Sequence, residues 1–262
     1  MGPSNIRLES SNLDALIREQ LTELRAGRVD ARRVLLLGSY QRQRACASLL
    51  LGLDTADFGR RLVKVGLGYL FLLDRRSSLQ SPDPYYLARS KGTALFDALA
   101  AGDLSLTRDI AEKSPAKWTE GMEDEDDFRY MAAVASLAEG PASVTAAPAL
   151  DELKRSLGGA ASARASVLLA VQQRDHGAFE EALEALLLGW ANRAEKARKS
   201  SVASPYFVNI EAHICIEGLA LVRLARQHGL STAEAYPFVP KEALTVPELP
   251  ARPSLWEDLG SS

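Results

Sequence analysis

The segment AFEEALEALLLGWANRAEKARK, residues 178–199, decides the fold class of this chain. Its apolar residues recur every three or four positions, which lines up Phe179, Leu183, Leu186, Leu187 and Trp190 along one side of a helix. Lysine and arginine gather in its last turn, where the negative end of the helix dipole favours cations. The segment is therefore predicted to be one long amphipathic helix with one buried side.

A second decisive segment lies nearer the N-terminus. Residues 62–73 carry two apolar stripes side by side, and a helix that is apolar on two faces is usually covered by neighbours on both. Residues 55–73 are therefore predicted to form a central helix. Gly66 and Gly68 lie within it, at a cost in helix propensity of about 1 kcal/mol each, and are expected to let another helix approach closely.

Composition agrees with helices throughout. Only 6% of residues are aromatic, and leucine and alanine are abundant, which suits packed helices better than a β-sandwich. The predicted fold is all-α, a multi-helix bundle or a solenoid-like stack of about ten helices, with no strand and no fixed repeat period.

Capping residues and breaks in the pattern predict where helices begin and end. Asn12 is predicted to cap the first helix, and Asn209 to cap a helix over residues 210–228. The other predicted helices cover residues 29–51, 85–101, 103–113, 128–137, 150–157 and 160–173. The proline-rich segment 237–253 is predicted to be an extended tail, pinned by Phe238 and Trp256.

The chain divides at residues 140–148, which hold two prolines and several small residues, a composition typical of a linker. This segment separates an N-terminal helical region, residues 1–140, from a C-terminal helical region, residues 149–262. A length of 262 residues allows one large helical domain or two small ones. We expect the two regions to pack as one body.

Charge and cysteine content indicate the kind of partner and the cellular compartment. The net charge is −3 and the pI about 5.8, without the basic face of a nucleic-acid-binding protein. The isolated Cys46 and Cys215 indicate a reducing compartment. Residues 1–5 lack the pattern of a signal peptide, and the apolar run 62–73 is too short to span a bilayer. We expect a cytoplasmic protein without a membrane or nucleic-acid partner.

Five consecutive acids, Glu123, Asp124, Glu125, Asp126 and Asp127, form the main charge feature. A calcium loop alternates acids with spacers around a central glycine, a pattern that this run lacks, so no metal site is predicted here. One or two of the acids would stabilise the following helix N-terminus by about 0.3–1 kcal/mol each. The others form either a solvated loop or a docking surface for a basic partner, and we take all five as candidate partner-binding residues.

Catalytic chemistry finds little support in the sequence. His213 and Glu217 are four residues apart on a predicted helix and would share a face, with Glu211 nearby. A zinc site normally needs three protein ligands, and no second histidine or cysteine stands at ligand spacing, so a His–Glu pair that fixes helix packing is the simpler interpretation. No phosphate loop or nucleophile elbow occurs. We expect no catalytic residue, no metal and no cofactor.

The C-terminal half resembles a known family. Residues 204–230, SPYFVNIEAHICIEGLALVRLARQHGL, and the following YPFVP at 236–240 are similar to the immunity protein 49 family of bacterial proteins. In that family a helix that ends in Ala-Arg-x-x-Gly-Leu precedes a short segment with aromatic residues and proline. The resemblance is strongest over residues 175–245 and looser over 29–110. A different family of helical immunity proteins, which neutralise nuclease toxins, is the related possibility.

The resemblance implies a cytoplasmic antidote that binds and neutralises a cognate polymorphic toxin in competition between bacteria. A toxin of nuclease type would present a cationic groove, which the acidic run would occupy in place of phosphates. The alternatives are a helical-repeat adaptor that binds another cellular protein and a metal-dependent enzyme around His213. A toxin gene directly upstream would separate the antidote from the adaptor.

Overall fold

The computed structural model describes residues 3–77, 79 and 84–245. These residues confirm the all-α fold, since they form helices and turns and one isolated antiparallel bridge between Tyr236 and Val239, but no strand. None of the described helices is both long and apolar enough to cross a membrane. The α-helices are α1 (Pro3–Arg25), α2 (Ala31–Gly52), α3 (Thr55–Arg75), α4 (Pro84–Leu87), α5 (Ala94–Ala101), α6 (Leu104–Lys113), α7 (Glu125–Ala138), α8 (Ala146–Ser156), α9 (Ala163–Gln173), α10 (His176–Arg198), α11 (Pro205–Asn209), α12 (Ile216–Gln227) and α13 (Lys241–Leu244), and the 3-10 turns are η1 (Arg89–Lys91) and η2 (Glu211–His213).

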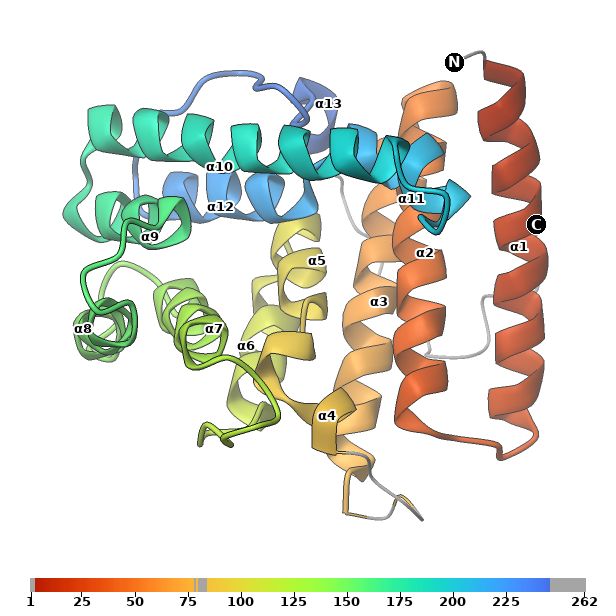
Figure 1. The fold of residues 1–262 in the computed structure, drawn as a ribbon, viewed down its shortest axis with the longest axis horizontal. Coiled ribbons are helices and arrows are strands. Elements are labelled where there is room, and N and C mark those ends of the chain that lie inside the picture. The colour runs from red at the N-terminus through yellow and green to blue at the C-terminus, as the bar shows by residue number, and fades with distance from the viewer. Residues whose placement is uncertain (1–2, 78, 80–83, 246–262) are drawn as a thin grey trace.

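The helices are arranged around a short central one. The first three, α1, α2 and α3, form an antiparallel layer, with α2 packed against both α1 and α3 (Figure 1). Helix α5 packs against α3 on one side and α12 on the other, while α7, α8, α9 and α10 complete the far side. As the two-stripe pattern predicted, α3 is covered by several neighbours, namely α2, α5 and α6.

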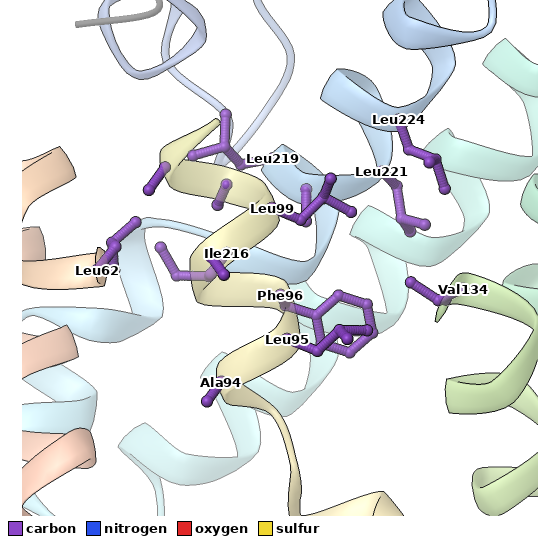
Figure 2. Close-up of a cluster of buried hydrophobic side chains, with 14 of the residues drawn as sticks. Leu62, Ala94, Leu95, Phe96, Leu99, Val134, Ile216, Leu219, Leu221 and Leu224 are labelled. Carbon is purple, nitrogen blue, oxygen red and sulfur yellow. The ribbon is translucent and has the colours of Figure 1, made fainter. Parts of the chain in front are cut away.

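Helix α5 is the centre of the hydrophobic core, and all eight of its residues are buried. Its alanines keep the helix thin, so that its neighbours approach closely, and its larger side chains fill the space between them. Figure 2 shows the surrounding cluster, whose labelled members are Leu62, Ala94, Leu95, Phe96, Leu99, Val134, Ile216, Leu219, Leu221 and Leu224. Each large side chain buried there contributes about 1.5–3 kcal/mol relative to an exposed one. The core therefore joins helices from both sides of residues 140–148.

The close approach expected at the α3 glycines occurs at Gly66. A Cβ placed there would lie 2.6 Å from Leu106 Cδ2 of α6 and 3.4 Å from Ala98 Cβ of α5, so a larger residue would push both helices away. Gly68 has more room, since its nearest neighbour would be Val34 Cγ1 at 3.9 Å. The prediction is confirmed for Gly66, whereas no close approach depends on Gly68.

The N-terminal helix begins earlier than the sequence predicted. Helix α1 starts at Pro3, so Asn12 lies in its interior and does not cap it. The buried side of the helix extends two further turns to Ile6, which packs against the core, and Ser10 on the same side is buried. Proline is well suited to a first helical position, because its missing N–H has no partner there in any case.

The predicted helix over residues 85–101 is broken into α4, η1 and α5. The break lies where the chain passes over Tyr69 of α3: a Cβ on Gly92 would sit only 2.9 Å from the tyrosine hydroxyl. A continuous helix would project side chains into that ring. The chain therefore bends at Gly92 and covers Tyr69 with backbone.

The prediction that Asn209 caps a helix was also wrong. Asn209 is the last residue of α11, and α12 begins only after Cys215, whose Sγ accepts from the backbone N–H of Gly218 at 3.3 Å. The backbone N–H of Cys215 donates to the carbonyl of Phe238 at 2.8 Å. This tertiary bond holds residue 215 in an extended conformation, which interrupts the helical pattern of the sequence.

The C-terminal segment is held on α12 by two arginines. Arg223 Nη2 donates to the carbonyls of Ala243 at 2.8 Å and Thr245 at 3.1 Å, and Arg226 Nη2 donates to the carbonyl of Ala233 at 3.1 Å. Part of the predicted extended tail is the short helix α13. Trp256 lies outside the described residues.

Candidate functional site

The acidic run lies at the N-terminus of α7, which starts three residues earlier than predicted. Asp124 occupies the N-cap position, although its side chain caps no backbone N–H, and the next three acids form the first turn. Negative charge is favoured there by the positive end of the helix dipole. Of the five acids, only Asp124 and Asp126 are exposed, whereas Glu123, Glu125 and Asp127 are half-buried.

The half-buried acids have partners within the chain. Glu123 Oε2 accepts from the backbone N–H of Ser90 at 2.7 Å, which ties the run to η1. Glu125 Oε1 lies 3.1 Å from Arg129 Nη2 on the same helix. These two acids are occupied in holding the fold, so their capacity to meet a partner is reduced.

Asp127 belongs to a partly buried charge network between three helices. Arg164 of α9 lies 3.0 Å from Asp127 Oδ1 of α7 and 2.7 Å from Glu217 Oε1 of α12. The hydroxyl of Tyr130 donates to the same Glu217 oxygen at 2.9 Å. Burial raises the pKa of the Asp127 carboxyl, and the Arg164 charge opposes that rise. The network fixes the position of the α7 N-terminus, and with it the directions of Asp124 and Asp126.

The residues considered for metal chemistry do not come together. His213 ends η2, while Glu217 lies in α12 beyond the break at Cys215, so the two do not share one continuous helix. Glu217 pairs with Arg164, and Glu211 accepts from Gln43 Nε2 at 3.1 Å. Among the described residues, no group of three or more histidine, cysteine, aspartate or glutamate side chains is placed to hold a metal ion.

A pocket of about 410 Å³ lies between α2 and α3 on one side and α4 and η1 on the other. Val34 and Gly38 of α2 and Val65 of α3 form an apolar part of its lining, and Tyr85 and Tyr86 contribute from α4. Gly38 widens the pocket because it has no side chain. A Cβ at this position would have one atom within 4 Å, Val65 Cγ1 at 3.4 Å, so the space beside it is open. Such mixed apolar and aromatic linings are typical of binding sites.

The polar end of this pocket is built around Arg42. Its Nε donates to Asp97 Oδ1 at 2.7 Å, and its Nη2 donates both to the other oxygen of Asp97 and to Thr93 Oγ1 at 2.9 Å. Burial raises the pKa of the Asp97 carboxyl, and the adjacent Arg42 charge opposes that rise. Asp97 is fully buried beneath the pocket, whereas Arg42, Thr93 and Lys91 line it.

The pocket and the acidic run are neighbours. Ser90 lines the pocket, and its backbone N–H is the group that binds the Glu123 carboxylate. Lys91, the next residue, places its Nζ 4.3 Å from the centre of the Tyr85 ring. Cationic and acidic groups thus adjoin on one part of the molecule.

Comparison with models of known families matches residues 41–243 to the family described as Immunity protein 49. The chain belongs to this family. The match covers most of the chain, including the acidic run and η1, and it confirms the resemblance seen in the C-terminal half. Neither the curated proteins nor the solved structures yielded a match.

In this member of the immunity protein 49 family, the pocket is not evident from the sequence. Its lining comes from α2, α3 and the segment 85–94, which are separate in sequence and meet only in the fold. Two features of the sequence are consistent with a pocket. Tyr85 and Tyr86 follow a segment rich in serine and proline, and Gly38 lies within a predicted helix. Neither feature could show that the three segments face one another.

Proposed function

We propose that this chain is an antidote that binds and neutralises a cognate protein toxin, without catalysing a reaction itself. The observation that carries this proposal is the family match over residues 41–243. An antidote of this kind works in the compartment where the toxin would act on the producing cell. We therefore place the chain in the cytoplasm, in keeping with its two cysteines, which are buried and unpaired.

Neutralisation by binding requires a surface that is already in shape before the toxin arrives. The Arg164 network and the Arg42–Asp97 pair hold α7, α9, α12, α2 and α5 in fixed positions. A surface fixed in this way loses little conformational entropy on binding, which favours tight association.

We further propose that the exposed acids of the run, Asp124 and Asp126, face a cationic surface of the toxin, as a nuclease-type effector domain would offer. Charges of opposite sign speed the encounter of two proteins and select the partner. The remaining three acids position this pair from within, through Ser90, Arg129 and Arg164. We therefore assign the docking role to Asp124 and Asp126, two of the five acids of the run.

The proposal is tested with the protein encoded directly upstream of this chain's gene. Production of that protein alone should arrest growth, and co-production of this chain should restore it. The purified pair should form a stable complex. Growth arrest that persists when this chain is present, together with no complex by calorimetry, would refute the antidote function.

A further inference from the structure

The pocket beside the acidic run has a consistent electrostatic character. Among the described residues that line it, the charged side chains are Arg42 and Lys91, and both are cations. Two carboxylates face Arg42, those of the fully buried Asp97 and of Glu211 at 3.9 Å, and neither residue lines the pocket. A group that enters the pocket therefore meets positive charge at its surface, with the compensating negative charge behind it.

Hydrogen-bonding capacity points the same way. Thr93 Oγ1 already accepts from Arg42 Nη2, so the hydrogen of that hydroxyl remains to donate. Lysine and arginine donate hydrogen bonds but accept none. Lys91 and Thr93 thus offer donors to a group in the pocket, whereas Arg42 Nε and Nη2 already donate to Asp97 and Thr93. A carboxylate is the protein group that accepts several hydrogen bonds and carries negative charge.

The rim of the pocket is preformed for a protein partner. Tyr85 is 45% exposed, a high value for a large aromatic side chain, and its ring stacks under the Lys91 ammonium group at 4.3 Å. This cation–π contact holds the lysine in place before any ligand arrives. Tyrosine is one of the residue types that dominate the affinity of protein interfaces.

We propose that this pocket receives an aspartate or glutamate side chain of the bound toxin, with its carboxylate directed to Lys91 and Thr93 and its apolar stem against Val34 and Tyr85. This inference rests on the proposed antidote function and names the contact that it uses. Asp124 follows Glu123 in the chain, and the Glu123 carboxylate binds the backbone of Ser90, so the exposed acids and the cation-lined pocket adjoin. Such a pattern of opposite charges fixes the orientation of a partner as well as its identity.

A filled pocket provides the first test. Gly38→Leu places a side chain into the hollow from a helix interior, where leucine is also favoured over glycine. The variant is expected to keep or gain thermal stability and to bind the toxin about tenfold more weakly or worse, by calorimetry with the upstream-encoded protein. Gly189→Leu is the matched control, because Gly189 is an exposed glycine within α10 with no atom near its Cβ position. The control should retain wild-type affinity.

Charge reversal at Lys91 provides the second test, which does not require that the pocket be filled by a new side chain. Lys91→Glu should weaken binding about a hundredfold at low salt, and one toxin variant with a single aspartate or glutamate changed to lysine should restore it. Lys91→Gln should weaken binding less and reduce its dependence on salt. The rescue by one toxin position identifies the carboxylate that enters the pocket.

The outcomes separate this inference from the proposed function. If the wild-type chain binds no toxin, the antidote function fails and the pocket assignment falls with it. If the wild-type chain binds while Gly38→Leu and Lys91→Glu retain full affinity, only the pocket assignment is overturned. A wild-type homodimer that Gly38→Leu converts to monomer, with toxin affinity unchanged, would instead assign the pocket to a second copy of this chain.

Discussion

Arg42 and Asp97 lie 55 positions apart in the chain, and their side chains meet in the core, where Arg42 Nε donates to Asp97 Oδ1 at 2.7 Å. The pair joins α2 to α5, the helix on which the core is centred. Glu211 of η2 approaches the same guanidinium, with its Oε1 3.9 Å from Arg42 Nη1. One buried cation therefore connects three segments and also forms the polar end of the pocket.

Removal of the Asp97 charge is expected to be costly. Asp97→Asn leaves a buried guanidinium with only Glu211 as a counter-charge, and breaking a buried pair in this way destabilises a protein by about 3–5 kcal/mol. We expect the free energy of unfolding in urea to fall by about 3 kcal/mol, the lower end of that range, because Glu211 remains. Asp74→Asn, which removes the exposed partner of Lys113, should leave the free energy of unfolding nearly unchanged. Equal losses in the two variants would show that Arg42 gains little from Asp97.

The glycines of α3 provide a test of packing. Gly66→Ala would place a Cβ 2.6 Å from Leu106 Cδ2, so the Leu106 side chain or α6 itself must shift, and we expect a loss of about 1–3 kcal/mol in unfolding free energy. Gly68→Ala, with 3.9 Å to its nearest neighbour, should be neutral or stabilise by up to about 1 kcal/mol. Chemical denaturation of both variants measures the two changes in unfolding free energy. Similar effects at the two positions would contradict the close approach at Gly66.

Acidification should weaken the ion pairs that Asp57 makes with Arg60 and Arg61 along α3. Burial opposes ionisation of this carboxyl, but the charges of Arg61 and Arg60 prevail and lower its pKa. A lowered pKa in the folded state means that the ionised form stabilises the fold above the unfolded pKa of about 3.9, and that this contribution disappears as the pH falls through the folded value.

The stability difference between the wild type and Asp57→Asn should therefore be present at pH 7 and shrink at pH 3, measured by urea unfolding. Asp151→Asn, a change at a side chain that is 71% exposed, should have little effect at either pH. A difference at Asp57 that is the same at both pH values would show that its charge does not stabilise the fold.

The two exposed acids of the run should govern the rate of toxin association. Asp124→Asn combined with Asp126→Asn is expected to slow association about tenfold at low salt. The loss of stability should not exceed about 1–2 kcal/mol, the helix-dipole contribution of two acids, because neither side chain forms an ion pair among the described residues. The matched control, Glu181→Gln with Glu184→Gln, removes the same charge from exposed positions of α10. Surface plasmon resonance at two salt concentrations measures both pairs. Equal effects in the two pairs would indicate general charge attraction without a docking role for the run.

The sequence predicts the helices well where packing alone determines them. The long helix over 178–199 corresponds to α10, and the helix over 103–113 to α6, because their apolar spacing and their capping residues agree. The predictions for Asn209 and residues 85–101 fail because tertiary contacts override local preference there: Cys215 binds the carbonyl of Phe238, and Gly92 passes over Tyr69. Such contacts join residues distant in sequence, and helical periodicity does not register them.

The candidate site shows the same division. The acidic run is evident from composition, but the roles of its members depend on Ser90, Arg129 and Arg164, which only the fold brings near. The pocket requires three segments to meet and is therefore invisible in the sequence. We propose that the regions 1–140 and 149–262 fold as one body, since α5 of the first packs against α12 of the second.

The antidote function is tested by calorimetric titration of the upstream-encoded protein into this chain, at physiological salt. We predict a one-to-one complex with a dissociation constant in the nanomolar range, which corresponds to a binding free energy of about −12 kcal/mol. We also predict restored growth when both proteins are made in the same cell. Absence of measurable heat, combined with undiminished growth arrest in the presence of this chain, would contradict the antidote function.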